Sequence, residues 1–177
     1  MRATVHNNKN GFSVLVAVEN YPGAAAGKSL SHKFVHVRNL YYQKLGIDVT
    51  VLSFAEKASY TYEGIDVISV GEYRRRRGCY DLLLCHQPNL KHHLLFCLRY
   101  SNDFIGMVFF FHGHEVLKIS QAYPKPYPYV RSSSIAIALR DMYDELKFHV
   151  WRCYFSRVRE SSFFVFVSQW MYDEFMK

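Results

Sequence analysis

One short run limits the folds open to this chain more than any other. Met107–Phe111 is apolar at every position, and it ends in His112-Gly113-His114-Glu115. An apolar run without alternation is typical of a strand covered on both faces, as in a parallel sheet. In open α/β folds, ligands bind just beyond the carboxyl ends of such strands. The four residues that end this run are therefore the first candidates for a functional site.

Other apolar runs repeat this pattern and alternate with helical segments. We expect strands at 12–18, 47–53, 64–70, 80–86, 106–111 and 163–167. We expect helices at about 30–45 and 89–100, a long one from about 134, and a last one from 169. Such alternation implies right-handed crossovers and a mostly parallel sheet. The predicted fold is α/β: a single Rossmann-like domain over 12–177, with helices on both faces of the sheet and a flexible tail at 1–11.

The two longest predicted helices carry apolar residues at helical spacing. In the first helix these are Leu30, Phe34, Val37 and Tyr41, and Gly46 ends it. In the long helix they are Ile135, Leu139, Met142, Leu146, Val150 and Cys153. An amphipathic helix packs its apolar side on the core, so we expect these sides to be buried.

Hydropathy and charge bear on location and partners. No apolar run approaches the ~20 residues that span a bilayer, and the polar start lacks a signal-peptide core, so we expect a cytoplasmic protein. The net charge of +7 favours anionic partners. Arg74–Arg77 is equally well interpreted as a solvated face. Basic residues with Trp151 and Phe155 on the long helix suit peripheral membrane contact or, alternatively, a helix packed on the core; we expect no nucleic-acid partner.

The loop after the first strand suggests phosphate binding but is no P-loop. It contains Gly23, Gly27, Lys28 and Ser29, and a Walker A motif would need a further glycine where Pro22 stands. A helix N-terminus can still hold an anion, and a plain tight turn is the alternative. We expect no metal and no cofactor, because His112-Gly113-His114-Glu115 lacks the helical spacing of H-E-x-x-H and the four cysteines form no C-x-x-C pair.

Five segments occur in an order that resembles a known family. They are Tyr21–Gly27, Lys44–Val51, Tyr80–His86, His112–Glu115 and Val165–Met171. Together they resemble the N-terminal domain of GT-B glycosyltransferases, in the large retaining family numbered four. The loop departs from the family pattern, because three alanines separate Gly23 from Gly27.

The resemblance implies transfer of a sugar from a nucleotide-sugar donor to a glycan or lipid-linked acceptor with retention. By motif position, His112 is the catalytic histidine near the reacting sugar. The donor-phosphate loop is implied to be Gly23, Gly27 and Lys28, and the acceptor side His86, Gly113, His114 and Glu115. We expect the donor-binding domain to be missing, and this chain alone to be inactive.

Alternative roles remain open for these residues. His112 could be a loop histidine bonded to backbone, His86 a structural residue, and Glu115 a cap for the turn that follows. For the whole chain, the alternative function is a non-enzymatic Rossmann-like module that binds an anionic ligand or a membrane surface.

Overall fold

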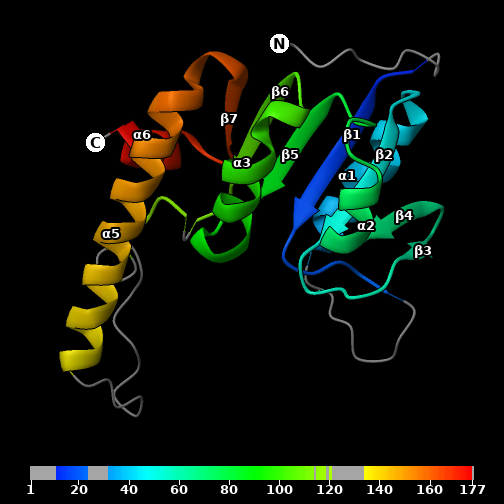
Figure 1. The fold of residues 1–177 in the computed structure, drawn as a ribbon. Helices are drawn as coiled ribbons and strands as arrows, with labels where there is room; N and C mark the ends of the chain where they lie inside the picture. The colour runs from blue at the N-terminus through cyan, green and yellow to red at the C-terminus, as the bar shows by residue number, and fades with distance from the viewer. Residues whose placement is uncertain (1–10, 24–31, 114, 119, 121–133, 177) are drawn as a thin grey trace.

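The computed structural model describes residues 11–23, 32–113, 115–118, 120 and 134–176. Within these residues seven strands form one sheet in the order β3-β4-β2-β1-β5-β6-β7 (Figure 1). Neighbouring strands are parallel except for the edge pair β3-β4. The strands are β1 (Ser13–Val18), β2 (Asp48–Ser53), β3 (Tyr60–Tyr62), β4 (Ile65–Ile68), β5 (Leu82–His86), β6 (Gly106–Phe111) and β7 (Ser162–Phe166). The predicted α/β, Rossmann-like domain with a mostly parallel sheet is confirmed.

Helices cover both faces of this sheet and create two apolar cores. They are α1 (Lys33–Lys44), α2 (Val70–Arg75), α3 (Leu95–Tyr100, entered through a π-helical turn at Leu90–Leu94), α5 (Ser134–Val158) and α6 (Gln169–Met176). Val35 of α1 packs with the strands on one face. On the other face, Tyr73 of α2, Phe96 of α3, Trp151 of α5 and Met171 of α6 share a second core. The central strand β1 is therefore buried at every residue.

The third strand, predicted at 64–70, is shorter in the structure, where β4 covers Ile65–Ile68. The chain forms a hairpin instead, in which β3 pairs antiparallel with β4 at the edge of the sheet. Glu63 and Gly64 join the two strands with φ of 46° and 80°, which is the left-handed backbone of a tight hairpin turn. Val70 then begins α2, and the Oγ of Ser69 caps that helix by accepting the N–H of Glu72 at 3.2 Å. The sequence interpretation missed both β3 and α2.

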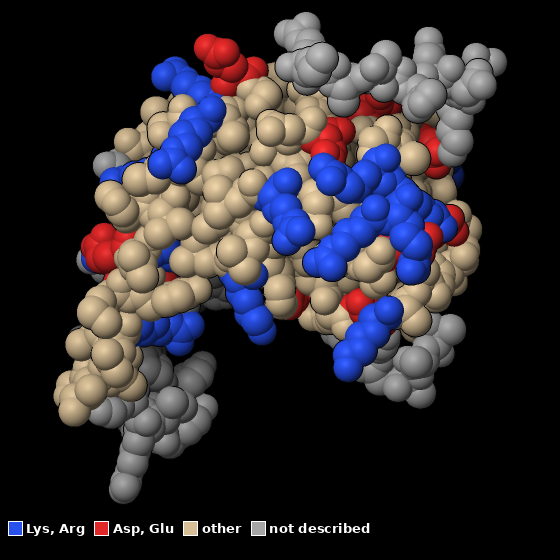
Figure 2. All heavy atoms as spheres, in the orientation of Figure 1, with Lys and Arg blue, Asp and Glu red and all other residues tan. Residues whose placement is uncertain are grey.

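The side chains of Arg74–Arg77 form ion pairs and hydrogen bonds with nearby residues. Lys and Arg side chains gather over α2 on the face in Figure 2, with acidic groups between them. Arg75 and Arg76 both pair with Glu72, and Arg77 pairs with Asp103 at 2.7 Å. The remaining member, Arg74, donates from Nε to the hydroxyl of Tyr100 at 3.2 Å. Three of the four arginines therefore form local ion pairs, two of them with the same carboxylate.

The predicted buried side of α1 is wrong. Phe34, Val37 and Tyr41 are 44%, 64% and 60% exposed, and Leu30 lies outside the described residues. The buried positions are Val35, His36 and Asn39. Two of these are polar, and they are buried because the hydroxyl of Tyr21 lies 2.7 Å from Nδ1 of His36 and accepts the amide N–H of Asn39 at 3.2 Å.

The predicted buried side of α5 is also wrong. Five residues of that side are exposed: Ile135, Leu139, Met142, Leu146 and Cys153. The residues buried against the sheet are Trp151, Tyr154 and Phe155. The aromatic residues that suggested membrane contact therefore belong to the core. Among the described helices, none combines the length and the apolar character needed to cross a bilayer.

Candidate functional site

The carboxyl ends of β5 and β6 bring two histidines together. His86 is the last residue of β5, and His112 follows Phe111 at the end of β6. The strands are parallel neighbours, so both side chains leave the sheet at the same edge. Nδ1 of His86 lies 3.3 Å from Nε2 of His112. The two predicted strand ends therefore lie side by side, and a shared role of His86 and His112 in a binding cleft stays a prediction.

Glu115 fixes the turn that carries His112. Its Oε2 accepts the backbone N–H of His112 at 3.0 Å and that of Gly113 at 2.7 Å. Glu115 is buried, and bonds from backbone N–H groups to a carboxylate are charge-assisted. The structure therefore gives Glu115 the role of a cap, and binding of an acceptor hydroxyl by Glu115 stays a prediction.

Both histidines sit in surroundings that favour the neutral imidazole. His86 is fully buried and stacks on Phe110, with ring centroids 4.3 Å apart. Burial, followed by the charge of Arg38, holds the pKa of His86 well below its ordinary value of 6.5. Burial also lowers the pKa of His112, while the Glu115 carboxylate opposes that shift. A neutral imidazole has one donor and one acceptor nitrogen, which suits contact with hydroxyl groups.

The first helix contributes two residues that the sequence interpretation missed. Phe34 packs against His112 with ring centroids 4.8 Å apart. One turn later, Arg38 places its Cζ 4.8 Å from the centre of the Phe110 ring. Their i, i+4 spacing was a signal that they share a helix face. It was misread, because Phe34 was assigned to a core-facing side.

Two residues with left-handed backbone close the cluster. His32 and Gln87 have φ of 69° and 51°, a backbone conformation that residues other than glycine rarely adopt. Nε2 of His32 donates to Oε1 of Gln87 at 2.8 Å. Strained backbone of this kind is concentrated at ligand sites. The bond joins the start of α1 to the end of β5.

The cluster has more polar nitrogen than its neighbours satisfy. Nη1 of Arg38, Nε2 of His86 and Nδ1 of His32 are buried without a hydrogen-bond partner among the described residues. A buried polar atom without a partner is costly and calls for an explanation. Hydroxyl or oxyanion groups of a ligand are the natural partners for such nitrogens.

Most of the predicted donor-phosphate loop lies outside the described residues. Gly27 and Lys28 fall there, and so does His114. Gly23 is described and partly buried. The backbone just before it is held by Tyr60, whose hydroxyl donates to the carbonyl oxygens at 21 and 22 at 3.2 and 3.0 Å.

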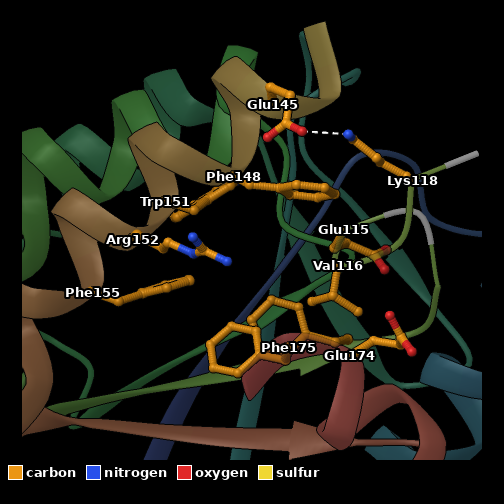
Figure 3. A pocket seen from close by; sticks show the side chains of 11 residues that line it. Glu115, Val116, Lys118, Glu145, Phe148, Trp151, Arg152, Phe155, Glu174 and Phe175 are labelled. Carbon is orange, nitrogen blue, oxygen red and sulfur yellow. Dashed lines mark ion pairs between the residues drawn. The ribbon is translucent and has the colours of Figure 1, made fainter. Parts of the chain in front are cut away.

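Two cavities adjoin the turn at Glu115. One, of about 280 Å³, lies between α5, α6 and the segment after β6, with Phe148, Trp151 and Phe155 among its walls (Figure 3). The other, of about 340 Å³, reaches from Gln87 to Glu115. The described residues contain no group of three His, Cys, Asp or Glu side chains arranged to hold a metal ion.

Comparison with protein-family models, with curated proteins and with solved structures gives no match for this chain. The resemblance to retaining glycosyltransferases therefore depends on the order of motifs in the sequence.

Proposed function

We propose that this chain is the acceptor-side domain of a retaining GT-B glycosyltransferase. The observation that carries the proposal is the pair of neutral histidines at the ends of β5 and β6, held 3.3 Å apart beside Glu115. Chemistry at this edge is what a Rossmann-like sheet favours. A nucleotide sugar is the donor in this proposal, and a glycan or lipid-linked sugar is the acceptor.

The two rings give His112 a defined way to meet a sugar hydroxyl. Because the rings share one hydrogen bond, the tautomer of His112 is coupled to that of His86. When His112 donates through Nε2, its Nδ1 is left as an acceptor for a hydroxyl proton. Glu115 positions the ring by binding the backbone N–H of His112.

The remaining functional residues extend the same proposal. His86, Gly113, His114 and Glu115 line the acceptor side, while Gly23, Gly27 and Lys28 approach the diphosphate of the donor. In this proposal a second domain supplies most of the donor contacts. The protein works in the cytoplasm, with peripheral contact at a membrane when the acceptor is lipid-linked.

The test is sugar transfer by the complete gene product, supplied with a panel of nucleotide sugars and assayed for nucleotide release. His112→Ala is expected to lower the rate by about a hundredfold or more, the scale of a lost acid-base group. His149→Ala, at an exposed position of α5, is the matched control and should leave the rate unchanged. Circular dichroism checks that both variants fold.

Two results would contradict the proposal. One is a His112→Ala variant that keeps a rate within about twofold of the parent, because that group would then contribute nothing of the size expected. The other is a complete product that consumes none of the nucleotide sugars.

A further inference from the structure

The cavity between α5 and α6 is separate from the histidine pair and has walls of a different chemistry. Figure 3 shows Trp151, Arg152 and Phe155 projecting from α5 toward the segment after β6, with Phe175 entering from α6. Its volume of about 280 Å³ is near the lower end of small-molecule pockets, which is roughly 300 Å³. That size suits a ligand of one or two rings.

The charged side chains around the cavity leave one positive group unmatched. Oε2 of Glu115 is taken by two backbone N–H groups, and Lys118 forms an ion pair with Glu145. Glu174 also has an interaction partner. Arg152 has no hydrogen bond or ion pair to any described residue, although its guanidinium points into the cavity in Figure 3. A guanidinium in that position is suited to bind an anionic oxygen from a ligand.

The walls next to Arg152 are flat and aromatic. Trp151 and Phe155 stack with ring centroids 4.9 Å apart and planes 17° apart. The ring centroid of Phe175 lies 6.3 Å from that of Phe155, across the gap between the helices. Within the part of the chain that the structure describes, the indole N–H of Trp151 is buried without an acceptor. Trp151 and Phe155 are buried in the core and form the floor of the cavity. The apolar surface open to a planar group comes from the partly buried rings of Phe148 and Phe175.

We propose that this cavity binds a small organic anion, a planar apolar body that bears a carboxylate or a phosphate. The body lies against Phe148 and Phe175, and the anion pairs with Arg152. The inference does not depend on sugar transfer, since it uses neither His86 nor His112.

Calorimetric titration of the chain with three matched probes tests the site. Naphthoate and naphthyl phosphate carry the two candidate anions, and naphthamide is the neutral isostere of naphthoate. We expect at least one anionic probe to bind about tenfold or more tightly than naphthamide, because a charge-assisted bidentate bond is lost in the amide. The better of the two anions identifies which acid the site takes.

Two substitutions on α5 separate the site from general attraction by a basic protein. Arg152→Met keeps the apolar stem and removes the guanidinium, and should weaken the anionic probe about tenfold while leaving naphthamide unchanged. Arg157→Met removes one charge from an exposed position of the same helix and should change neither. Equal binding of the anion to Arg152→Met and to the parent would overturn the inference, and so would the absence of binding by both anions at millimolar concentration.

Discussion

Mild acid should destabilise this protein through His93, a histidine buried beneath β1. The N–H of Asn89 points at Nδ1 of His93 at 3.4 Å, so Nδ1 must accept. The proton therefore stays on Nε2, which donates to the carbonyl of Ala17 at 3.3 Å. Protonation of Nδ1 would place its N–H directly against the N–H of Asn89 in a fully buried site. Burial accordingly lowers the pKa of His93 to about 4.

The sign and size follow from this shift. His93 binds a proton in the unfolded chain at an ordinary pKa of 6.5 and in the folded chain only near 4. The stability that it contributes is therefore present above pH 6.5 and is lost as the pH falls through that window. Between pH 7.5 and 5.0 the free energy of unfolding should fall by ~2 kcal/mol on account of His93 alone.

Urea denaturation of the parent and of His93→Gln at both pH values measures that contribution. The variant should lose ~2 kcal/mol less than the parent on acidification, because glutamine does not titrate. His149→Gln, at an exposed position, should show the full loss. The reasoning is refuted if parent and His93→Gln lose the same amount. Ring nitrogen shifts in NMR give a second reading, and protonation of His93 in the folded parent at pH 6 would refute it as well.

Three further substitutions should lower stability, each measured by urea denaturation at neutral pH. Asp81→Ala should cost ~2 kcal/mol, because Oδ2 of Asp81 accepts both the N–H and the hydroxyl of Ser13 at 2.8 and 2.9 Å; no change would mean that water replaces it. Gly46→Ala should cost ~1 kcal/mol, since φ is 79° there although the space around it is open, and an unchanged midpoint would contradict that strain. Ser69→Ala should cost ~1 kcal/mol by removing the cap on Glu72, whereas Ser69→Asp should retain it.

The strands were predictable because their evidence is local. A strand covered on both faces must be apolar along its length, and β1, β5 and β6 each carry that pattern within six residues. Their shared direction in an α/β chain then places the last residues of β5 and β6 at one edge. His86 and His112 could therefore be placed together from the sequence alone.

The edge hairpin shows where local evidence ends. β3 has only three residues, none of them fully buried, and although Tyr and Thr favour strands, so short a run is below the length that a strand prediction needs. It exists because β4 offers a free edge and because Glu63 and Gly64 make the turn. Pairing with an existing edge is decided in the folded chain.

What the sequence by itself determined is the α/β class, the parallel strands and the edge at which His86 and His112 meet, because apolar runs record burial on both faces. Only the tertiary structure decided which side of α1 faces inward. Tyr21 supplies hydrogen bonds that allow His36 and Asn39 to be buried, and that rotation brings Arg38 over Phe110. A helix buries the side for which distant residues provide partners, and its own periodicity does not reveal those partners.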